Sequence, residues 1–227
     1  MAGRMVGRKF LFVFLVIVLS AGGCRTRQSK DISVTSEGSA DKDSTYLFDG
    51  KTLDGWEITN FGPQGPVYVS GDEIILGMGD GCTGITCLKK IPASGYEVTL
   101  EAKKVDGNDF FCGLTFPAGN YPCTLIVGGW GGTVVGLSSI NGMDASENET
   151  TTSRSFEKDR WYTIRLKVTD LKIEAWIDSG KVVDFTIGDN ILSIRPEVEL
   201  SKPLGIASWR TTAAIRNIRL LPYKESN

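Results

Sequence analysis

Histidine is absent from this chain of 227 residues. A Ser-His-Asp triad, a Cys-His catalytic pair and a zinc or iron site with histidine ligands are therefore excluded. Acid–base chemistry near neutral pH must use carboxylates, or a lysine, tyrosine or cysteine whose pKa is shifted. Calcium stays possible as a cofactor, because it binds oxygen ligands alone.

A hydrophobic run long enough to span a bilayer is also lacking. The longest, residues 10–19, falls short of the roughly 20 residues that a membrane helix needs. It follows the basic residues Arg4, Arg8 and Lys9 and precedes small residues that end at Cys24. This order predicts a secretory signal. Small residues directly before a cysteine resemble a bacterial lipobox, which implies cleavage before Cys24 and a diacylglycerol on its thiol. An ordinary signal peptide with a chance cysteine is the alternative.

These features divide the chain into four parts. We expect a lipoprotein signal peptide at residues 1–23 and a polar, disordered tether at residues 24–45. One folded domain should span residues 46–223, and a short tail residues 224–227. The expected location is the bacterial cell envelope, in the outer membrane or the periplasm, with a lipid anchor as the only membrane contact.

The charge balance argues against nucleic acid as a partner. The chain has a formal net charge of −2, which becomes more negative once the basic leader is removed. Nucleic-acid binding needs basic patches, whereas a neutral ligand such as a carbohydrate is compatible with this charge.

Cysteine is scarce after the leader. An even number in a secreted chain suggests disulfides. If the turn between two strands centres near residues 118–119, Cys112 and Cys123 face each other closely enough for a bridge. The pairing of the other two stays open, the spacings disfavour zinc, and all four could instead be buried apolar side chains. The four are Cys82, Cys87, Cys112 and Cys123.

Short β-rich runs recur every eight to twelve residues or so along the rest of the chain. Two runs alternate cleanly between apolar and polar positions, at residues 96–103 and 161–168, which predicts antiparallel sheet with one solvated face. "DSGK" at residues 178–181 is typical of a hairpin turn. The only helix candidate lies around residues 195–200. Together these patterns predict an all-β, two-sheet sandwich.

Three segments carry a family resemblance: "LFDGKTLDGWE" at 47–57, the strands of 159–185, and "LGIASWRTTAAIRNIRLLP" at 204–222. They resemble the 3-keto-disaccharide hydrolase family over nearly all of residues 46–223. The resemblance implies a concanavalin A-like jelly-roll of the lectin/glucanase type, secreted or lipid-anchored. It also implies cleavage of glycosides whose glucose unit is oxidised at carbon 3. The Asp-Gly turns of the first segment should direct Phe48 and Trp56 into the core.

Two departures from the family prevent any transfer of catalytic residues. Many members carry a glutamate where this chain has Leu125 and Ile126, and a histidine in the turn where it has Trp209 and Arg210. The site must therefore be sought in this chain's own residues.

The first candidate is "GGWGG" at residues 128–132. Glycines allow a close approach of backbone to a ligand, and Trp130 between them could stack on a sugar ring. A bend with Trp130 in the core is the alternative.

The loop after it supplies three carboxylates, Asp144, Glu147 and Glu149, as candidate catalytic residues or calcium ligands. A ketone acidifies the neighbouring C–H, so cleavage by elimination needs a base there and an acid at the leaving oxygen. A solvated loop is the alternative. If it applies, the catalytic carboxylates should be Asp109, Glu197 or Glu199.

Further candidates for substrate binding are Asn108, Asp109, Trp209 and Arg210. The sequence thus predicts an envelope-anchored protein that cleaves 3-keto glycosides, as a hydrolase or a lyase. Two alternatives are a non-catalytic carbohydrate-binding module and a structural lipoprotein.

Overall fold

The computed structural model describes residues 44–223. The predicted signal peptide, the lipidation site Cys24, most of the predicted tether and the tail lie outside the described residues. Within the described part, no helix is long and apolar enough to span a bilayer.

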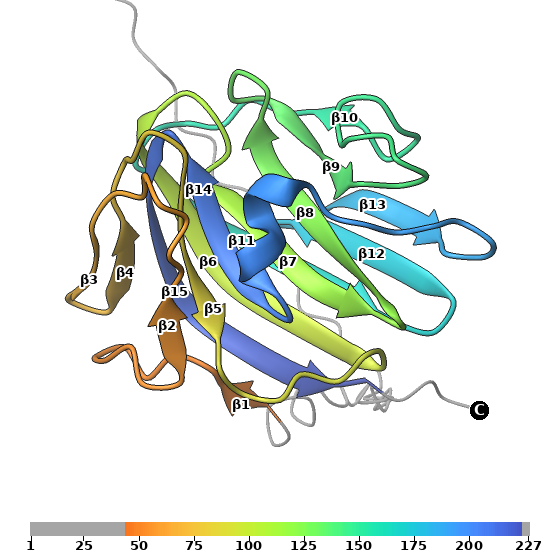
Figure 1. Cartoon of the computed structure of the whole chain (residues 1–227), viewed down its shortest axis with the longest axis horizontal. Helices are drawn as coiled ribbons and strands as arrows, with labels where there is room; N and C mark the ends of the chain where they lie inside the picture. Colours follow the sequence, from red (N-terminus) through yellow and green to blue (C-terminus); the bar gives the residue numbers. More distant parts are fainter. Residues whose placement is uncertain (1–43, 224–227) are drawn as a thin grey trace, which may run out of the picture. The chain divides into compact units, whose positions relative to one another are not determined.

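The domain consists of two antiparallel sheets packed face to face, as predicted (Figure 1). One sheet has the order β13-β12-β11-β6-β15-β4-β3, with β1 added to β15, and is called here the charged sheet. Its strands are β1 (Thr45–Tyr46), β3 (Val67–Ser70), β4 (Glu73–Leu76), β6 (Tyr96–Gly107), β11 (Trp161–Val168), β12 (Lys172–Ile177), β13 (Gly180–Thr186) and β15 (Thr211–Pro222).

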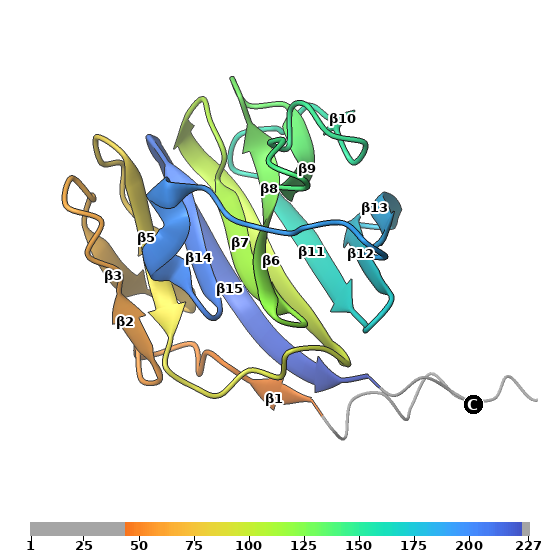
Figure 2. The ribbon, with the colours of Figure 1, turned by 45° about the vertical axis from the view of Figure 1, so that its right-hand side comes forward.

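The other sheet, called here the pocket sheet, has the order β10-β9-β8-β7-β14-β5-β2. Figure 2 shows the two layers from the side, with the single 3₁₀ helix of the described residues, η1 (Pro196–Ser201), on the outer face of this sheet. Its strands are β2 (Trp56–Ile58), β5 (Cys82–Cys87), β7 (Cys112–Ala118), β8 (Tyr121–Gly129), β9 (Val134–Ser138), β10 (Thr152–Ser153) and β14 (Gly205–Trp209).

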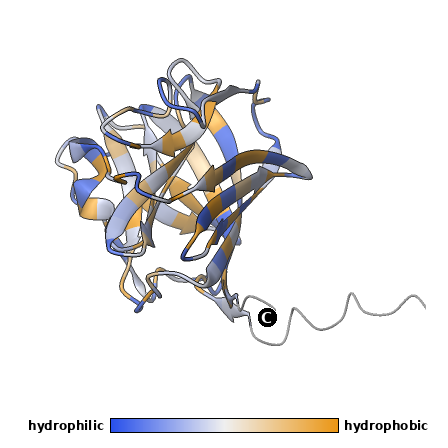
Figure 3. Ribbon diagram, turned by 90° about the vertical axis from the view of Figure 1, so that its right-hand side faces the viewer, coloured by the Kyte–Doolittle hydropathy of each residue, from blue (hydrophilic) through white to orange (hydrophobic). Residues whose placement is uncertain are grey.

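The core lies between the sheets and follows the alternation of the sequence, with apolar and polar positions succeeding each other along the strands (Figure 3). Tyr96 and Val98 of β6 are fully buried, and their register partners on β11, Val168 and Leu166, are buried too. The predicted hairpin joins β12 to β13 with Ile177 opposite Gly180. Period-two alternation therefore identified the inward face correctly.

The "LFDGKTLDGWE" segment closes one end of the core. Phe48 and Trp56 are buried, and Trp56 Nε1 donates to the carbonyl of Leu47 at 2.8 Å. Asp49 Oδ1 accepts hydrogen bonds from the backbone N–H groups of Lys51 at 2.7 Å and Thr52 at 2.8 Å. These bonds lower the pKa of the Asp49 carboxyl group. The segment has the structural role that its turn dipeptides predict.

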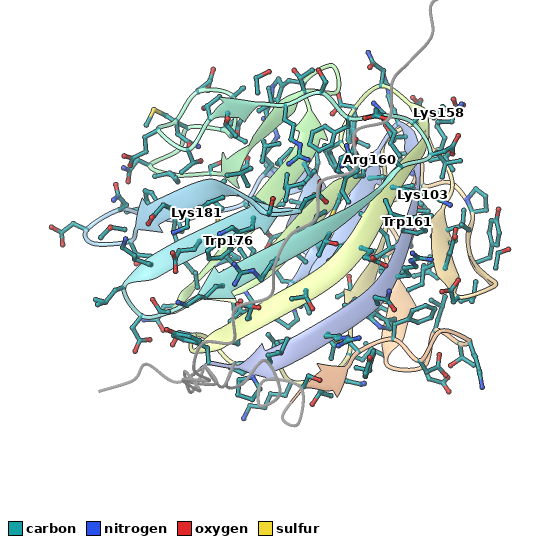
Figure 4. All side chains as sticks on the ribbon, turned by 180° about the vertical axis from the view of Figure 1, so that it is seen from behind. Lys103, Lys158, Arg160, Trp161, Trp176 and Lys181 are labelled. Carbon is teal, nitrogen blue, oxygen red and sulfur yellow. The ribbon has the colours of Figure 1, made fainter. Side chains whose placement is uncertain are left out.

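The outer face of the charged sheet is a lattice of paired charges and aromatic rings (Figure 4). The Arg165 guanidinium lies 3.6 Å from the centre of the Trp176 ring, and Lys103 Nζ lies 4.6 Å from that of Trp161. Glu174 accepts from Lys181 at 2.6 Å. Each of these cations therefore already has an aromatic or acidic partner within the face.

The predicted Cys112–Cys123 disulfide is wrong. Cys112 lies opposite Val127 and Cys123 opposite Phe116, because the turn centres between residues 119 and 120, about two residues beyond the midpoint of the two cysteines. The two cysteines are therefore offset by roughly 13 Å along the strands, beyond the reach of a disulfide. All four cysteines are buried free thiols, and burial raises the pKa of Cys112 and of Cys123 to about 12.

Candidate functional site

A pocket of about 220 Å³ opens on the outer face of the pocket sheet. Its lining comes from six separate parts of the chain, brought together by the order β9-β8-β7-β14-β5 and by η1. The lining residues are Cys82, Asp109, Phe110, Thr124, Ile126, Trp130, Ser138, Arg195, Glu197, Val198 and Trp209.

Small side chains on the outward positions of the strands leave room for this pocket. Gly113 of β7 is one example: a Cβ atom there would lie 3.0 Å from the Phe110 ring. Its absence lets Phe110 lie flat over the strand. Thr124 on β8 directs its hydroxyl to that of Thr115 at 3.0 Å, so the floor carries few unsatisfied polar groups.

Trp130 forms one side of the pocket and is 41% exposed. Its backbone has φ 47°, the left-handed region, between Gly128 and Gly131, which also have positive φ. A bulky residue in this conformation costs roughly 1–2 kcal/mol relative to the right-handed region. Strain of this kind is concentrated at binding and catalytic sites, and here it holds an indole ring at the mouth of a pocket.

Trp209 lies at the end of β14 and also lines the pocket. Its backbone N–H donates to the carbonyl of Phe110 at 3.0 Å, which joins the β14 end to the loop that carries Asp109. The structure thus brings together Trp130, Asp109 and Trp209, three of the residues named from the sequence. Two aromatic rings at one pocket suit the apolar faces of a sugar ring.

Asp109 is half-buried in the connection between β6 and β7. Its Oδ1 accepts the backbone N–H of Phe110 at 2.7 Å, and its own N–H donates to Thr211 Oγ1 at 3.0 Å. Oδ2 has no hydrogen-bond partner among residues 44–223 and is available to a ligand. Asp109 therefore offers one fixed and one free carboxylate oxygen.

Arg195 and Glu197 form the other polar part of the lining. Arg195 donates from Nε to Glu197 Oε2 at 3.2 Å and from Nη2 to Oε1 at 2.9 Å. These hydrogen bonds are the largest cause of the lowered pKa of Glu197 and of the raised pKa of Arg195. The sequence indicated Glu197 as an alternative catalytic carboxylate but gave Arg195 no role in the site, although the helix signal around residues 195–200 placed both on a single element.

Asp144 does not line the pocket but holds Arg195 from behind. Its Oδ2 accepts from Arg195 Nη1, and its Oδ1 accepts from Ser139 Oγ at 2.9 Å and Ser138 Oγ at 3.3 Å. The guanidinium is therefore fixed between two carboxylates, one on η1 and one on the loop after β9. Asp144 is best described as a positioning residue.

Glu147 and Glu149, the other two acidic candidates, are exposed and absent from the lining. The organiser of their loop is the buried Asn148, whose Nδ2 donates to the carbonyls of Leu137 at 2.7 Å and Asp144 at 2.8 Å. The expectation that this loop supplies the base is not supported, because its central side chain is an amide that satisfies backbone groups. Of the three carboxylates, Glu147 and Glu149 therefore lie on the solvated side of the loop, and Asp144 alone points toward the site.

Two substrate-binding candidates also lie outside the lining. Asn108 is exposed and lies against Gly132, where a Cβ atom would come within 2.9 Å of Asn108 Oδ1. Arg210 is exposed and pairs with Asp80 at 2.7 Å. Among the described residues no group of three or more cysteine, aspartate or glutamate side chains is arranged to hold a metal ion.

The fold and pocket define a carbohydrate-related β-sandwich of the concanavalin A-like type. Residues 43–221 match the family of 3-keto-α-glucoside-1,2-lyase-like domains, and the chain belongs to that family. No curated protein matches the sequence.

Solved structures share the fold at low sequence identity. A protein from Parabacteroides distasonis assigned as a glycosyl hydrolase is 15% identical, with 84% of this chain and 99% of that one covered and a TM-score of 0.53. A carbohydrate-binding module from Bacillus subtilis is also 15% identical, with 77% and 99% covered and a TM-score of 0.50. The Crh5 transglycosylase in complex with NAG is 14% identical, with 81% and 85% covered and a TM-score of 0.56. At these identities the likeness concerns the fold alone.

Proposed function

We propose that the protein cleaves the glycosidic bond of glycosides whose sugar unit carries a ketone at carbon 3. The observation that supports this most is the lining of a single pocket by Asp109, Arg195 and Glu197 together with two tryptophans. Membership in the 3-keto-α-glucoside-1,2-lyase-like family supports the same class of substrate.

In this proposal Asp109 is the base. The ketone acidifies the hydrogen on carbon 2, and the free Oδ2 of Asp109 takes that proton. Glu197 is the weaker candidate, because its ion pair with Arg195 lowers its pKa and therefore its basicity. Arg195 keeps two N–H groups beyond those that bind Glu197 and Asp144, and it stabilises the negative charge that develops on the ketone oxygen.

In the elimination the C2–H bond breaks, a C1=C2 double bond forms, and the C1–O bond to the leaving group breaks. The leaving oxygen takes a proton from water at the open mouth of the pocket. Addition of water across the new double bond would then give the product of net hydrolysis, so lyase and hydrolase outcomes share the same first step.

The test compares the purified protein on 3-keto-trehalose and on trehalose. We expect cleavage of the oxidised sugar alone, with ultraviolet absorbance of an enone if elimination occurs and free 3-keto-glucose if water is added. Asp109→Asn should lower kcat by at least about 100-fold, whereas the matched variant Glu149→Gln, outside the pocket, should not. Binding of both sugars without any cleavage would instead identify a carbohydrate-binding module.

We further propose that the protein is anchored to the bacterial envelope through a lipid on Cys24, which lies outside the described residues. The basic, apolar and small-residue order before Cys24 supports this. Cys24→Ser should release the protein from membranes and abolish labelling by radioactive palmitate. A Ser variant that remains in the membrane fraction would contradict the anchor.

A further inference from the structure

The charged groups at the pocket are unequal in number. Two carboxylates, Asp109 and Glu197, and one guanidinium, Arg195, line it. A third carboxylate, Asp144, contacts the same guanidinium from outside the lining. Three negative charges therefore face one positive charge, and no other charged side chain is part of the lining.

Arg195 would ordinarily suggest a site for an anionic ligand, because guanidinium groups bind carboxylates in pairs. Here that role is already filled. Glu197 takes the Nε and Nη2 edge, and Asp144 takes Nη1. The two remaining N–H groups can still donate to a ketone oxygen, before and during the reaction, but Arg195 together with its two carboxylate partners carries a net negative charge.

Cations at the rim are balanced as well. Arg210 beside Trp209 forms an ion pair with Asp80, and Lys202 at the end of η1 forms one with Glu199. Neither supplies free positive charge to an incoming anion. These two cations therefore do not offset the excess negative charge of the pocket.

The pocket wall shows the effect of this charge. Cys82 is a buried thiol of the lining, and its pKa is raised to about 12, first by burial and second by the negative charge of Glu197. A second anion placed in the pocket would experience the same repulsion. Such repulsion is strong where side chains are partly withdrawn from water.

We propose that the pocket selects neutral sugars and rejects anionic ones, such as uronates and sugars with sulfate or phosphate groups. The carboxylates Asp109 and Glu197 repel an anionic ligand. Arg195 does not compensate for this repulsion, because its positive charge is already paired with Glu197 and Asp144. This inference depends on the proposed function only in assigning a sugar to the pocket. Like charges brought together in this way weaken binding by roughly tenfold or more.

The experiment uses three ligands without a leaving group at carbon 1, so that binding is measured without cleavage. They are 3-keto-1,5-anhydroglucitol, its carbon-6 carboxylate and its carbon-6 carboxamide. The carboxamide matches the carboxylate in size but carries no charge. Calorimetric titration of the full-length protein at pH 7 should give similar Kd values for the alcohol and the carboxamide, and a Kd at least about tenfold higher for the carboxylate.

Two further measurements separate charge from shape. The ratio of the carboxylate Kd to the carboxamide Kd should decrease as the salt concentration rises from about 0.02 to about 0.5 M, because salt screens exposed charges. The same Kd ratio should also be smaller in Glu197→Gln than in wild type, but it should be unchanged in the matched variant Glu147→Gln on the loop outside the pocket. A Kd ratio that changes neither with salt concentration nor in Glu197→Gln would overturn the proposal.

The remaining outcomes are also decisive. Equal binding of carboxylate and carboxamide overturns the proposal, and so does a failure of all three ligands to bind. Charge selection together with no cleavage of 3-keto-trehalose would support the proposal while contradicting the proposed catalytic function.

Discussion

Arg195 and Glu197 are joined by two parallel hydrogen bonds, Nε to Oε2 at 3.2 Å and Nη2 to Oε1 at 2.9 Å. The pair lies two residues apart across the start of η1, so one short element presents both the guanidinium and its carboxylate to the pocket. This arrangement leads to the first prediction.

Replacing Arg195 by Met should lower kcat on 3-keto-trehalose by about 10²–10³-fold, the usual effect of losing one donor to a developing oxyanion. KM should change much less, because the charge on the ketone oxygen appears only during reaction. Steady-state kinetics measure both values. Arg210→Met is the matched control, since Arg210 is exposed and pairs with Asp80; an equal loss in both variants would refute the assignment.

Trp130 should be more important for binding than for stability. Trp130→Gly removes a strained left-handed tryptophan, so thermal unfolding should show no loss of stability and a gain of up to about 1 kcal/mol. Sugar affinity should fall by about 1 kcal/mol or more.

The buried Trp56, which donates to the carbonyl of Leu47, provides the contrast for this prediction. Trp56→Ala should cost about 3–5 kcal/mol of unfolding free energy. If Trp130→Gly were comparably destabilising, Trp130 would have to be regarded as a core residue.

Asn148 should control the stability of the loop that holds Asp144. Asn148→Ala leaves several buried carbonyl and N–H groups without partners, so urea unfolding should show a loss of about 2–3 kcal/mol. Glu147→Gln and Glu149→Gln in the same loop should change stability by less than about 0.5 kcal/mol. A large effect of either glutamine variant on turnover would restore that loop as the catalytic one.

Glu174 should contribute a pH-dependent part of the stability. Its pKa is lowered, first by the hydrogen bond from Lys181, with Lys167 adding to the effect. The contribution is therefore present above the ordinary pKa of 4.5 and is lost as pH falls through the lowered folded-state pKa.

We expect Glu174→Gln to lose about 1 kcal/mol in urea unfolding at pH 7, with the difference from wild type shrinking as pH falls below 4.5 and vanishing below the folded-state pKa of Glu174. Glu147→Gln serves again as the control, because Glu147 forms no such ion pair within residues 44–223. A difference that persists unchanged at low pH would mean that packing, and not charge, is responsible.

The strands and the inward face were predictable because their signals are local. Alternation in residues 96–103 depends on neighbours one and two positions away, and the hairpin at residues 178–181 on four adjacent residues. Likewise, the glycines around Trp130 made an exposed ring one of two alternatives, because glycine's tolerance of positive φ is a property of the chain at that point.

The site was only partly predictable because its contacts are long-range. Asp144 meets Arg195 from 51 residues away, and nothing in either local sequence specifies that pairing. The register of β7 with β8 shows the same limit: a shift of the turn by about two residues was enough to separate Cys112 from Cys123. Glu147 and Glu149 are close in sequence but lie outside the pocket. The carboxylates that line the pocket are far apart in sequence and are brought together by the order of the strands.

The last two strands have a consequence for the timing of folding. β14 lies between β7 and β5 in one sheet, and β15 lies between β6 and β4 in the other. Until β14 and β15 leave the ribosome, each layer is split in two along its middle, and neither half has its central hydrogen-bonding neighbour. Neither sheet can therefore be completed before these two strands are synthesised, which delays folding of the domain relative to synthesis of its other strands.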